Sequence, residues 1–437
     1  MPTCPLPAHP PSSGIVPRSK SAVLVPWLRA QSINVARHAA ALRPFRRDEF
    51  GTDPAAPSEG HIRAVNVLMT SLRRHLLGMT DKVRSAAAAA IDEPSTGYLQ
   101  RLVSHKERAH DSVRSIERIW DFYFELFGQR ESRFGRWLAG CDRIALDCYQ
   151  HSYLGIGVAR SVPAPPPFCY MRTGFSPATF RRRIPLRALG QQLNPFPLIQ
   201  LPYHRLVNPW TLGAILHELG HNLHNDLGLA QAVPDAIVER LLKAGFGRRV
   251  AAVWRRWNRE VFADLIALRL GGPFVVGSLL DVIGRSAATV VTYSPTGPHP
   301  TPYLRALISF ELLHRMGFQA EAERYRKLWS RMYPIASAGN IPRFLLETFP
   351  EANQLVVDTV CYKPYPSLGN KSLSAVLPFE QKEQRMIEEA GRRLAAGTDP
   401  GVVPERFLIG AARYALDNRL ARPGVIAEHF FKELARN

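Results

Sequence analysis

Residues 208–228 read Asn-Pro-Trp-Thr-Leu-Gly-Ala-Ile-Leu-His-Glu-Leu-Gly-His-Asn-Leu-His-Asn-Asp-Leu-Gly, and the rest of the sequence is best understood from this stretch. Asn208 and Pro209 supply an N-cap residue and a proline at the first helical position. The apolar residues then recur at spacings of three and four. They form one stripe, made of Leu212, Ile215, Leu216, Leu219 and Leu223. The pattern predicts an amphipathic helix that ends near Asn225-Asp226.

His217, Glu218 and His221 lie off that stripe and form the pattern His-Glu-x-x-His. Two histidines four residues apart lie one above the other on a helix and can bind one zinc ion. The adjacent Glu218 is then placed to accept a proton from a water molecule at the metal. Gly220 lies between the two histidines, where glycine costs about 1 kcal/mol of helix propensity. We therefore expect another segment to pack closely there.

A second helical stretch offers a third ligand, which catalytic zinc requires in addition to an open position for water. Residues 257–268 read Trp-Asn-Arg-Glu-Val-Phe-Ala-Asp-Leu-Ile-Ala-Leu. Glu260 and Asp264 are four residues apart and share a helix face. One carboxylate can bind the metal. The other can accept a hydrogen bond from the outer N–H of a ligand histidine, which fixes the tautomer of that histidine.

Together the two patterns resemble those of the gluzincin metallopeptidases, the thermolysin-like clan, over about residues 195–310. That clan pairs His-Glu-x-x-His on one helix with Glu-x-x-x-Asp on the next. The resemblance implies zinc ligands His217, His221 and Glu260, with Glu218 as general base and Asp264 beside a ligand histidine. It also implies a predominantly helical α+β fold, with a zincin-like domain, a small mixed sheet and an edge strand above the first zinc helix. The metzincin pattern is excluded, because it needs a histidine where this chain has Leu227.

Residues 196–201 predict the edge strand of such a fold. They read Phe-Pro-Leu-Ile-Gln-Leu between Pro195 and Pro202, and proline is tolerated at sheet edges. An edge strand can bind an extended peptide through its backbone. We therefore expect Leu198, Ile199 and Gln200 to bind the substrate, with an ordinary edge strand that binds no ligand as the alternative.

A loop further along the chain offers a candidate for stabilising negative charge. Residues 299–305 read His-Pro-Thr-Pro-Tyr-Leu-Arg and precede a predicted helix at 306–316. The segment is similar to a feature of the HtpX-like and CAAX-prenyl-protease group, which implies a place near the active site. His299 could donate a hydrogen bond to an oxyanion. Tyr293 and Tyr303 are alternatives for that role, and a purely structural loop histidine is another.

Composition describes an ordinary globular chain with a large excess of positive charge. Of 437 residues, 46% are hydrophobic and 21% charged, and the net charge is +19. Arginines spread through many segments favour an acidic partner or nucleic acid, although solvated surface charge explains them equally well. The five cysteines match neither a disulfide framework nor a Cys-x-x-Cys pair, which favours a reducing compartment. No run of about 20 apolar residues occurs, so we expect no transmembrane segment and a cytoplasmic location.

Four regions are expected along the chain. Residues 1–58 predict a basic, disordered tail, and residues 59–140 a helical hairpin. Residues 141–340 predict the zincin-like metallopeptidase domain, and residues 341–437 a helical C-terminal region. Within the third region we expect strands at 143–149, 153–158 and 169–172 and a helix at 177–189.

The sequence as a whole predicts a zinc-dependent metallohydrolase that acts on a peptide or protein substrate. Glu218 would activate water at the zinc for attack on a peptide bond. Two other functions remain open at this point. One is a non-catalytic scaffold or regulatory protein stabilised by zinc, and the other is a protease associated with nucleic acid.

Overall fold

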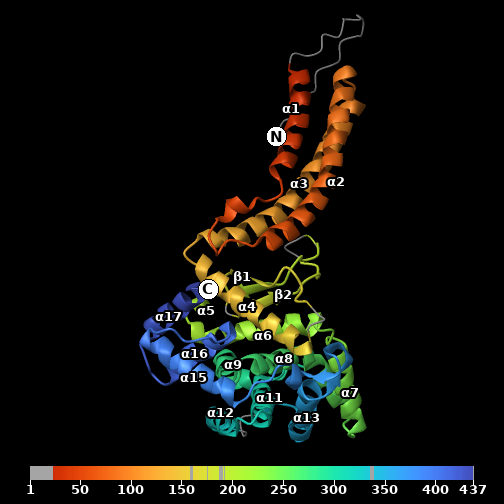
Figure 1. The fold of residues 1–437 in the computed structure, drawn as a ribbon. Helices are drawn as coiled ribbons and strands as arrows, with labels where there is room; N and C mark the ends of the chain where they lie inside the picture. Colours follow the sequence, from red (N-terminus) through yellow and green to blue (C-terminus); the bar gives the residue numbers. More distant parts are fainter. Residues whose placement is uncertain are drawn as a thin grey trace, which may run out of the picture. The chain divides into compact units, whose positions relative to one another are not determined.

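The chain forms two compact units in a computed structural model that describes residues 23–157, 161–174, 176–186, 190, 192–334 and 339–436. The described residues of unit 1 fall within 23–44 and 66–121, and those of unit 2 within 45–65 and 122–436. Both units are predominantly helical (Figure 1). None of the described helices combines the length and the apolarity needed to cross a lipid bilayer.

Unit 1 is built from helix α1 (Leu24–Ala41) and from parts of α2 (Glu59–Asp92) and α3 (Thr96–Gly128). The two long helices occupy the stretch in which the apolar spacing predicted a helical hairpin. The expectation that residues 1–58 are disordered is wrong for α1, and residues 1–22 lie outside the described residues. Buried α1 residues recur at helical spacing and join a core with the other two helices, which explains why this segment is ordered.

Unit 2 holds a small sheet and most of the helices. Its first helices are α4 (Gly135–Ile156), α5 (Tyr203–Leu206), α6 (Gly213–Asp226), α7 (Ala232–Lys243), α8 (Arg248–Gly271), α9 (Phe274–Ile283) and α10 (Ala287–Val290). They are followed by α11 (Pro302–Arg315), α12 (Gln319–Met332), α13 (Arg343–Cys361), α14 (Leu373–Val376), α15 (Gln381–Ala396), α16 (Glu405–Asp417) and α17 (Pro423–Arg436). A minor hairpin pairs β4 (Pro364–Tyr365) with β5 (Lys371–Ser372).

The main sheet has three strands in the order β1-β3-β2. Strand β3 (Leu198–Leu201) pairs in parallel with β1 (Phe168–Met171) and antiparallel with β2 (Ala178–Phe180). The strand expected at the sheet edge is therefore the central one. The helix expected at 177–189 is also wrong, because residues 178–180 form the outer strand β2.

The two strands expected at 143–149 and 153–158 are wrong as well, because helix α4 runs through this stretch as far as Ile156. Its buried residues recur at three and four, which is the period of a helix. Apart from the glycines Gly135 and Gly140, they are Leu138, Cys141, Ile144, Ala145, Cys148, Tyr149, Ser152 and Tyr153. A short apolar run read by itself resembles a strand, whereas the complete helix shows one continuous buried face.

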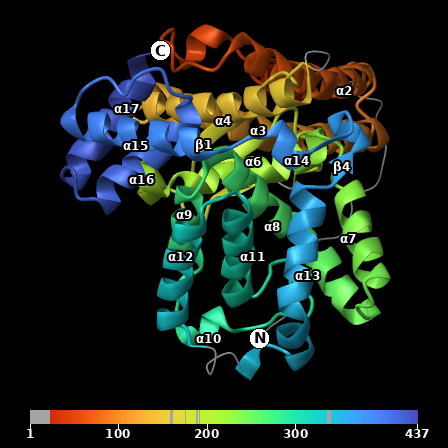
Figure 2. The ribbon, with the colours of Figure 1, turned by 60° about the horizontal axis from the view of Figure 1, so that its bottom comes forward.

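Helices α6 and α8 pack closely at the centre of unit 2, between the sheet and the row formed by α9, α11, α12 and α13 (Figures 1 and 2). Gly220 makes this closeness possible. A Cβ atom at Gly220 would lie 2.7 Å from Ile266 Cγ2 and 2.8 Å from Ala263 Cα, both on α8. The glycine between the two histidines therefore serves helix packing, as the sequence predicted.

Replacing Gly220 with alanine should destabilise unit 2. The new methyl group would meet backbone atoms of α8, and overpacking of this kind costs about 1–3 kcal/mol. Urea denaturation would measure the free energy of unfolding. Gly424→Ala in α17 is the matched control, because a Cβ there meets nothing within 4 Å. That control should be neutral or stabilising by up to about 1 kcal/mol, and equal stability of the two variants would contradict the packing argument.

Candidate metal centre

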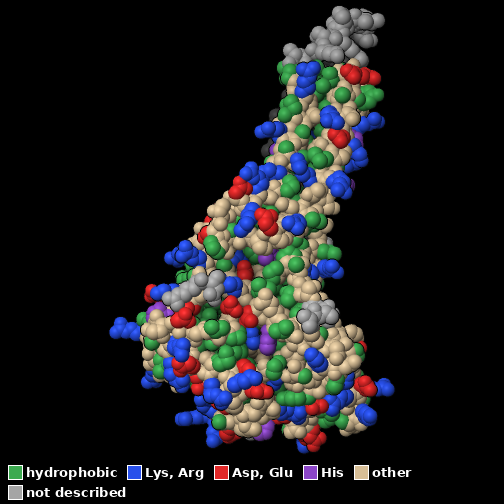
Figure 3. Space-filling view, in the orientation of Figure 1, with side chains coloured by type: hydrophobic (Ala, Val, Ile, Leu, Met, Phe, Trp, Pro, Cys, Tyr) green, Lys and Arg blue, Asp and Glu red, His purple; other side chains and the backbone are tan. Residues whose placement is uncertain are grey.

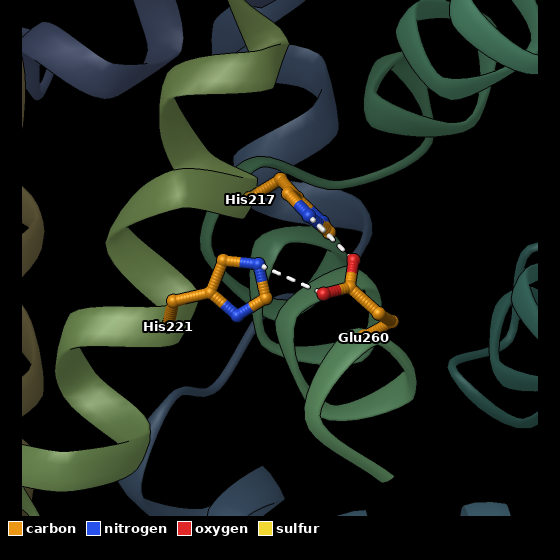
Figure 4. A group of neighbouring side chains, drawn as sticks. All are labelled: His217, His221 and Glu260. Atoms are coloured by element: carbon orange, nitrogen blue, oxygen red, sulfur yellow. Dashed lines mark ion pairs between the residues drawn. The ribbon is translucent and has the colours of Figure 1, made fainter. Parts of the chain in front are cut away.

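Helices α6 and α8 bring His217, His221 and Glu260 together, as the sequence predicted (Figure 4). His217 Nε2 lies 3.4 Å from Glu260 Oε2, and His221 Nε2 lies 3.5 Å from Glu260 Oε1. One ligand atom from each of the three side chains lies within 4.8 Å of the other two. The three side chains point toward one another from two adjacent helices and form a group that could bind a metal ion.

The donor set fits a small divalent metal ion. Imidazole nitrogen and carboxylate oxygen are ligands that zinc accepts. Tetrahedral bonds of about 2.0–2.1 Å place neighbouring ligand atoms about 3.4 Å apart. The two nitrogen–oxygen separations of 3.4 and 3.5 Å are close to that value.

Asp264 holds the outer nitrogen of His217, as the spacing of the second motif predicted. Asp264 Oδ1 lies 2.7 Å from His217 Nδ1. Arg305 from α11 binds the same carboxylate with both arms of its guanidinium, at 2.5 Å from Nε to Oδ2 and 2.8 Å from Nη2 to Oδ1. The carboxylate thereby fixes the imidazole so that Nε2 turns toward Glu260 and His221.

Sequence reasoning did not assign this role to Arg305. The residue is buried and lies 41 positions after Asp264 on a different helix. The only indication in the sequence that Arg305 lies near the site was its position at the end of the segment that begins at His299. A buried guanidinium that binds a buried carboxylate in two places is a strong interaction, and removing one partner of such a pair typically costs about 3–5 kcal/mol.

The charges of the metal-free site favour a proton on His217 and none on His221. Burial by itself would lower the pKa of His217, but the Asp264 and Glu260 carboxylates outweigh it and raise that pKa to about 9. Burial and the neighbouring His217 lower the pKa of His221 to about 2. Burial would raise the pKa of Glu260, but the two histidines and Arg305 lower it to about 2. A metal ion must therefore displace one proton, from His217.

Glu218 lies beside the ligand histidines and lines a cavity of about 290 Å³. Its side chain is buried, and burial together with the nearby Glu260 raises its pKa. A carboxylate in this environment holds a proton more readily than one in water. This is the property that a proton acceptor beside a metal site requires.

The cavity extends in two directions from the metal centre. Gly213, at the start of α6, packs against Ser278 of α9, whereas Asn222, near its end, donates a hydrogen bond to Thr179 Oγ1 of β2 at 2.8 Å. These two α6 residues are about 13 Å apart along the helix. An apolar wall from α9 and a wall from β2 thus lie toward opposite ends of α6. The lining residues include Pro177, Ala178, Thr179, Gly213, Ala214, Arg259, Val275, Val276, Leu279, Val282 and His299.

His299 lies at this cavity, and its two alternatives do not. His299 Nε2 is 3.4 Å from Glu260 Oε2, and the side chain is 60% exposed. Neither Tyr293 nor Tyr303 is among the described residues that line the cavity. Tyr303 is buried elsewhere, and the Tyr293 hydroxyl accepts a hydrogen bond from Arg256.

Leu198, Ile199 and Gln200 do not lie at the cavity, contrary to expectation. Strand β3 is paired on both sides, and its Leu198 and Ile199 are fully buried. Strand β2 instead forms the sheet edge beside α6, and its Ala178 and Thr179 line the cavity. Three of the four residues of β3 are apolar and buried, which is more typical of a central strand than of an exposed edge.

No protein-family model, no curated protein and no solved structure matches this chain. The function of the candidate metal centre is therefore inferred from its own residues and their geometry.

The affinity of the protein for zinc should rise with pH until about pH 9. Below the His217 pKa of about 9, zinc must displace a proton, so affinity falls about tenfold for each pH unit. Asp264→Asn removes a charge that raises this pKa. In the variant the rise should end at a lower pH, and affinity at high pH should be about 10–100-fold weaker. Competition with a chromophoric chelator would measure both curves, and identical profiles would contradict the role of Asp264.

Proposed function

We propose that this chain is a zinc-dependent hydrolase of the gluzincin type, a peptidase in which Glu218 acts as general base. The observation that carries the proposal is the position of the three candidate ligands relative to Glu218 and the cavity. The nitrogen and oxygen atoms of His217, His221 and Glu260 meet within 4.8 Å at the wall of a cavity that Glu218 also lines. Glu-x-x-x-Asp on α8 supplies both a ligand and a partner for His217, which is the arrangement that the gluzincin resemblance implies.

A zinc ion held by these three side chains would supply Lewis-acid chemistry, which acidifies water and polarises a carbonyl group. Glu218 would accept a proton from the attacking water and return it to the leaving amine. Asp264, itself held by Arg305, keeps the Nδ1–H of His217 engaged, so that Nε2 stays directed toward the ligand position. His299, which lines the cavity, would donate a hydrogen bond to the oxyanion.

The sheet edge supports a peptide as the substrate. Strand β2 pairs with β3 on one side, and its Ala178 and Thr179 line the cavity. A peptide in extended conformation can pair with such an edge through its backbone. The hydrogen bond from Asn222 to Thr179 Oγ1 ties β2 to α6, which fixes the edge relative to the two histidines.

Two observations favour this function over the alternatives. Structural zinc sites are closed by four protein ligands, whereas here three ligand groups lie beside a cavity. For nucleic acid, a basic stripe or patch is expected. On the face shown in Figure 3, Lys and Arg side chains are instead scattered among acidic ones.

Glu218→Gln should bind zinc with unchanged stoichiometry and lose peptide hydrolysis by a factor of about 10²–10⁴, because only the proton acceptor is removed. Metal analysis and proteome-wide cleavage profiling of the wild type and the variant would measure the two effects. His221→Ala is the matched control and should lose both zinc and cleavage. Undiminished cleavage by Glu218→Gln would contradict the role of Glu218 as general base.

A further inference from the structure

We infer that Arg259 and Arg181 form a subsite for a carboxylate beside the metal centre, and that the preferred substrates are peptides with an aspartate or glutamate near the cleaved bond. The inference rests on the proposed peptidase function and adds the substrate class. It begins from Arg259, which lines the cavity, and from Arg181, which follows strand β2. Neither has a hydrogen-bonded acidic partner among the described residues.

Arg259 lies on α8 immediately before the ligand Glu260, and its exposed side chain lines the cavity. Its charge is close enough to act on both Glu218 and His221. Within the described residues no hydrogen bond or ion pair engages its guanidinium. Arg259 therefore presents a guanidinium without a direct hydrogen-bond partner, among the described residues, next to the candidate metal centre.

Arg181 comes directly after strand β2, whose Ala178 and Thr179 line the same cavity. Its Nε is buried and has no hydrogen-bond partner within the described chain. Burial and the positive charge of Arg259 lower its pKa, while Asp226 acts against this from beyond hydrogen-bond range. Two arginines of unit 2, Arg305 and Arg406, differ from Arg181 because each binds a carboxylate directly. The two charges are close enough to act on each other, and neither guanidinium is hydrogen-bonded to a carboxylate among the described residues. A substrate carboxylate that reaches them would supply the missing partner.

The subsite has a defined place in the cavity. Arg181 follows strand β2, which is bonded through Thr179 to Asn222 near the C-terminal end of α6. The apolar α9 wall lies toward the N-terminal end of α6. His217 and Glu218 lie between these two walls. A peptide paired with β2 would thus place an acidic side chain at the two arginines and an apolar side chain against Val275, Val276 and Leu279.

A peptide carboxylate suits this site better than a nucleic-acid phosphate. The cavity of about 290 Å³ holds a few side chains, and the adjoining strand edge offers backbone groups for pairing. Binding of nucleic acid draws on many phosphate contacts spread along a surface, and the charges in Figure 3 do not gather into such a track.

The test compares short peptides that carry aspartate, asparagine or lysine at one scanned position. Cleavage by the zinc-loaded wild type gives kcat/KM, and binding to zinc-loaded Glu218→Gln gives affinity without turnover. At one position, kcat/KM should be about tenfold or more higher for aspartate than for asparagine, mainly because KM is lower. This preference should become smaller at high salt. Arg259→Gln should reduce the preference to less than about twofold, and Arg259→Glu should reverse it toward lysine. Arg255→Gln is the control, because Arg255 pairs with Asp235 on the surface one turn away.

Each outcome decides one of the two proposals. Cleavage without any preference for aspartate, unchanged in Arg259→Gln, would overturn the subsite and leave the peptidase intact. Arg259-dependent binding of aspartate peptides without cleavage would support the subsite and contradict the peptidase. A preference that vanishes when the C-terminus is amidated would assign the site to a terminal carboxylate and overturn the acidic side chain. A single-stranded DNA oligonucleotide that competes as strongly, and depends equally on Arg259, would overturn the peptide class.

Discussion

The buried carboxylates of Glu260 and Asp264 impose the constraint on which the centre of this structure depends. Both are less than a tenth exposed, and a buried charge without a partner costs several kcal/mol. Helix α8 can carry them because α6 brings His217 and α11 brings Arg305 to the same place. Those contacts require α6 and α8 to approach closely, and Gly220 allows that approach. The close packing of α6 and α8 and the pairing of the buried charges therefore depend on the same contacts.

The same arrangement prepares the ligand atoms before any metal binds. His217 is fixed from behind by Asp264, and Asp264 is fixed in turn by both arms of Arg305. The imidazole therefore does not have to rotate or change tautomer when a metal displaces its proton. A site held in this way loses little conformational entropy on binding. The cavity beside it leaves room for a substrate, and its two walls differ in chemical character.

The residues of the candidate metal centre could be predicted from the sequence, because they stand four apart on single helices. His217 with His221, and Glu260 with Asp264, needed only the period of the helix. Arg305 depends on how α11 packs against α8, and nothing in its local sequence reports that contact. The position of β3 depends on two strands at other points of the chain. The prolines around 196–201 therefore predicted an edge position, although β3 lies in the centre of the sheet. Strand β2 has only three residues, too few for a recognisable alternation. The strands wrongly expected within α4 have a different cause. Short apolar segments such as 143–149 resemble strands when each is considered alone, whereas the helical period appears only over the whole of α4.

The central claim is that His217, His221 and Glu260 bind one metal ion, and X-ray absorption at the zinc edge of the zinc-loaded protein tests it most directly. The account predicts a shell of four or five nitrogen and oxygen atoms at about 2.0–2.1 Å, with the outer scattering of two imidazole rings. His221→Ala should retain no zinc and therefore give no zinc-edge signal from this site. A sulfur shell at about 2.3 Å, or a shell of oxygen atoms without imidazole scattering, would contradict it.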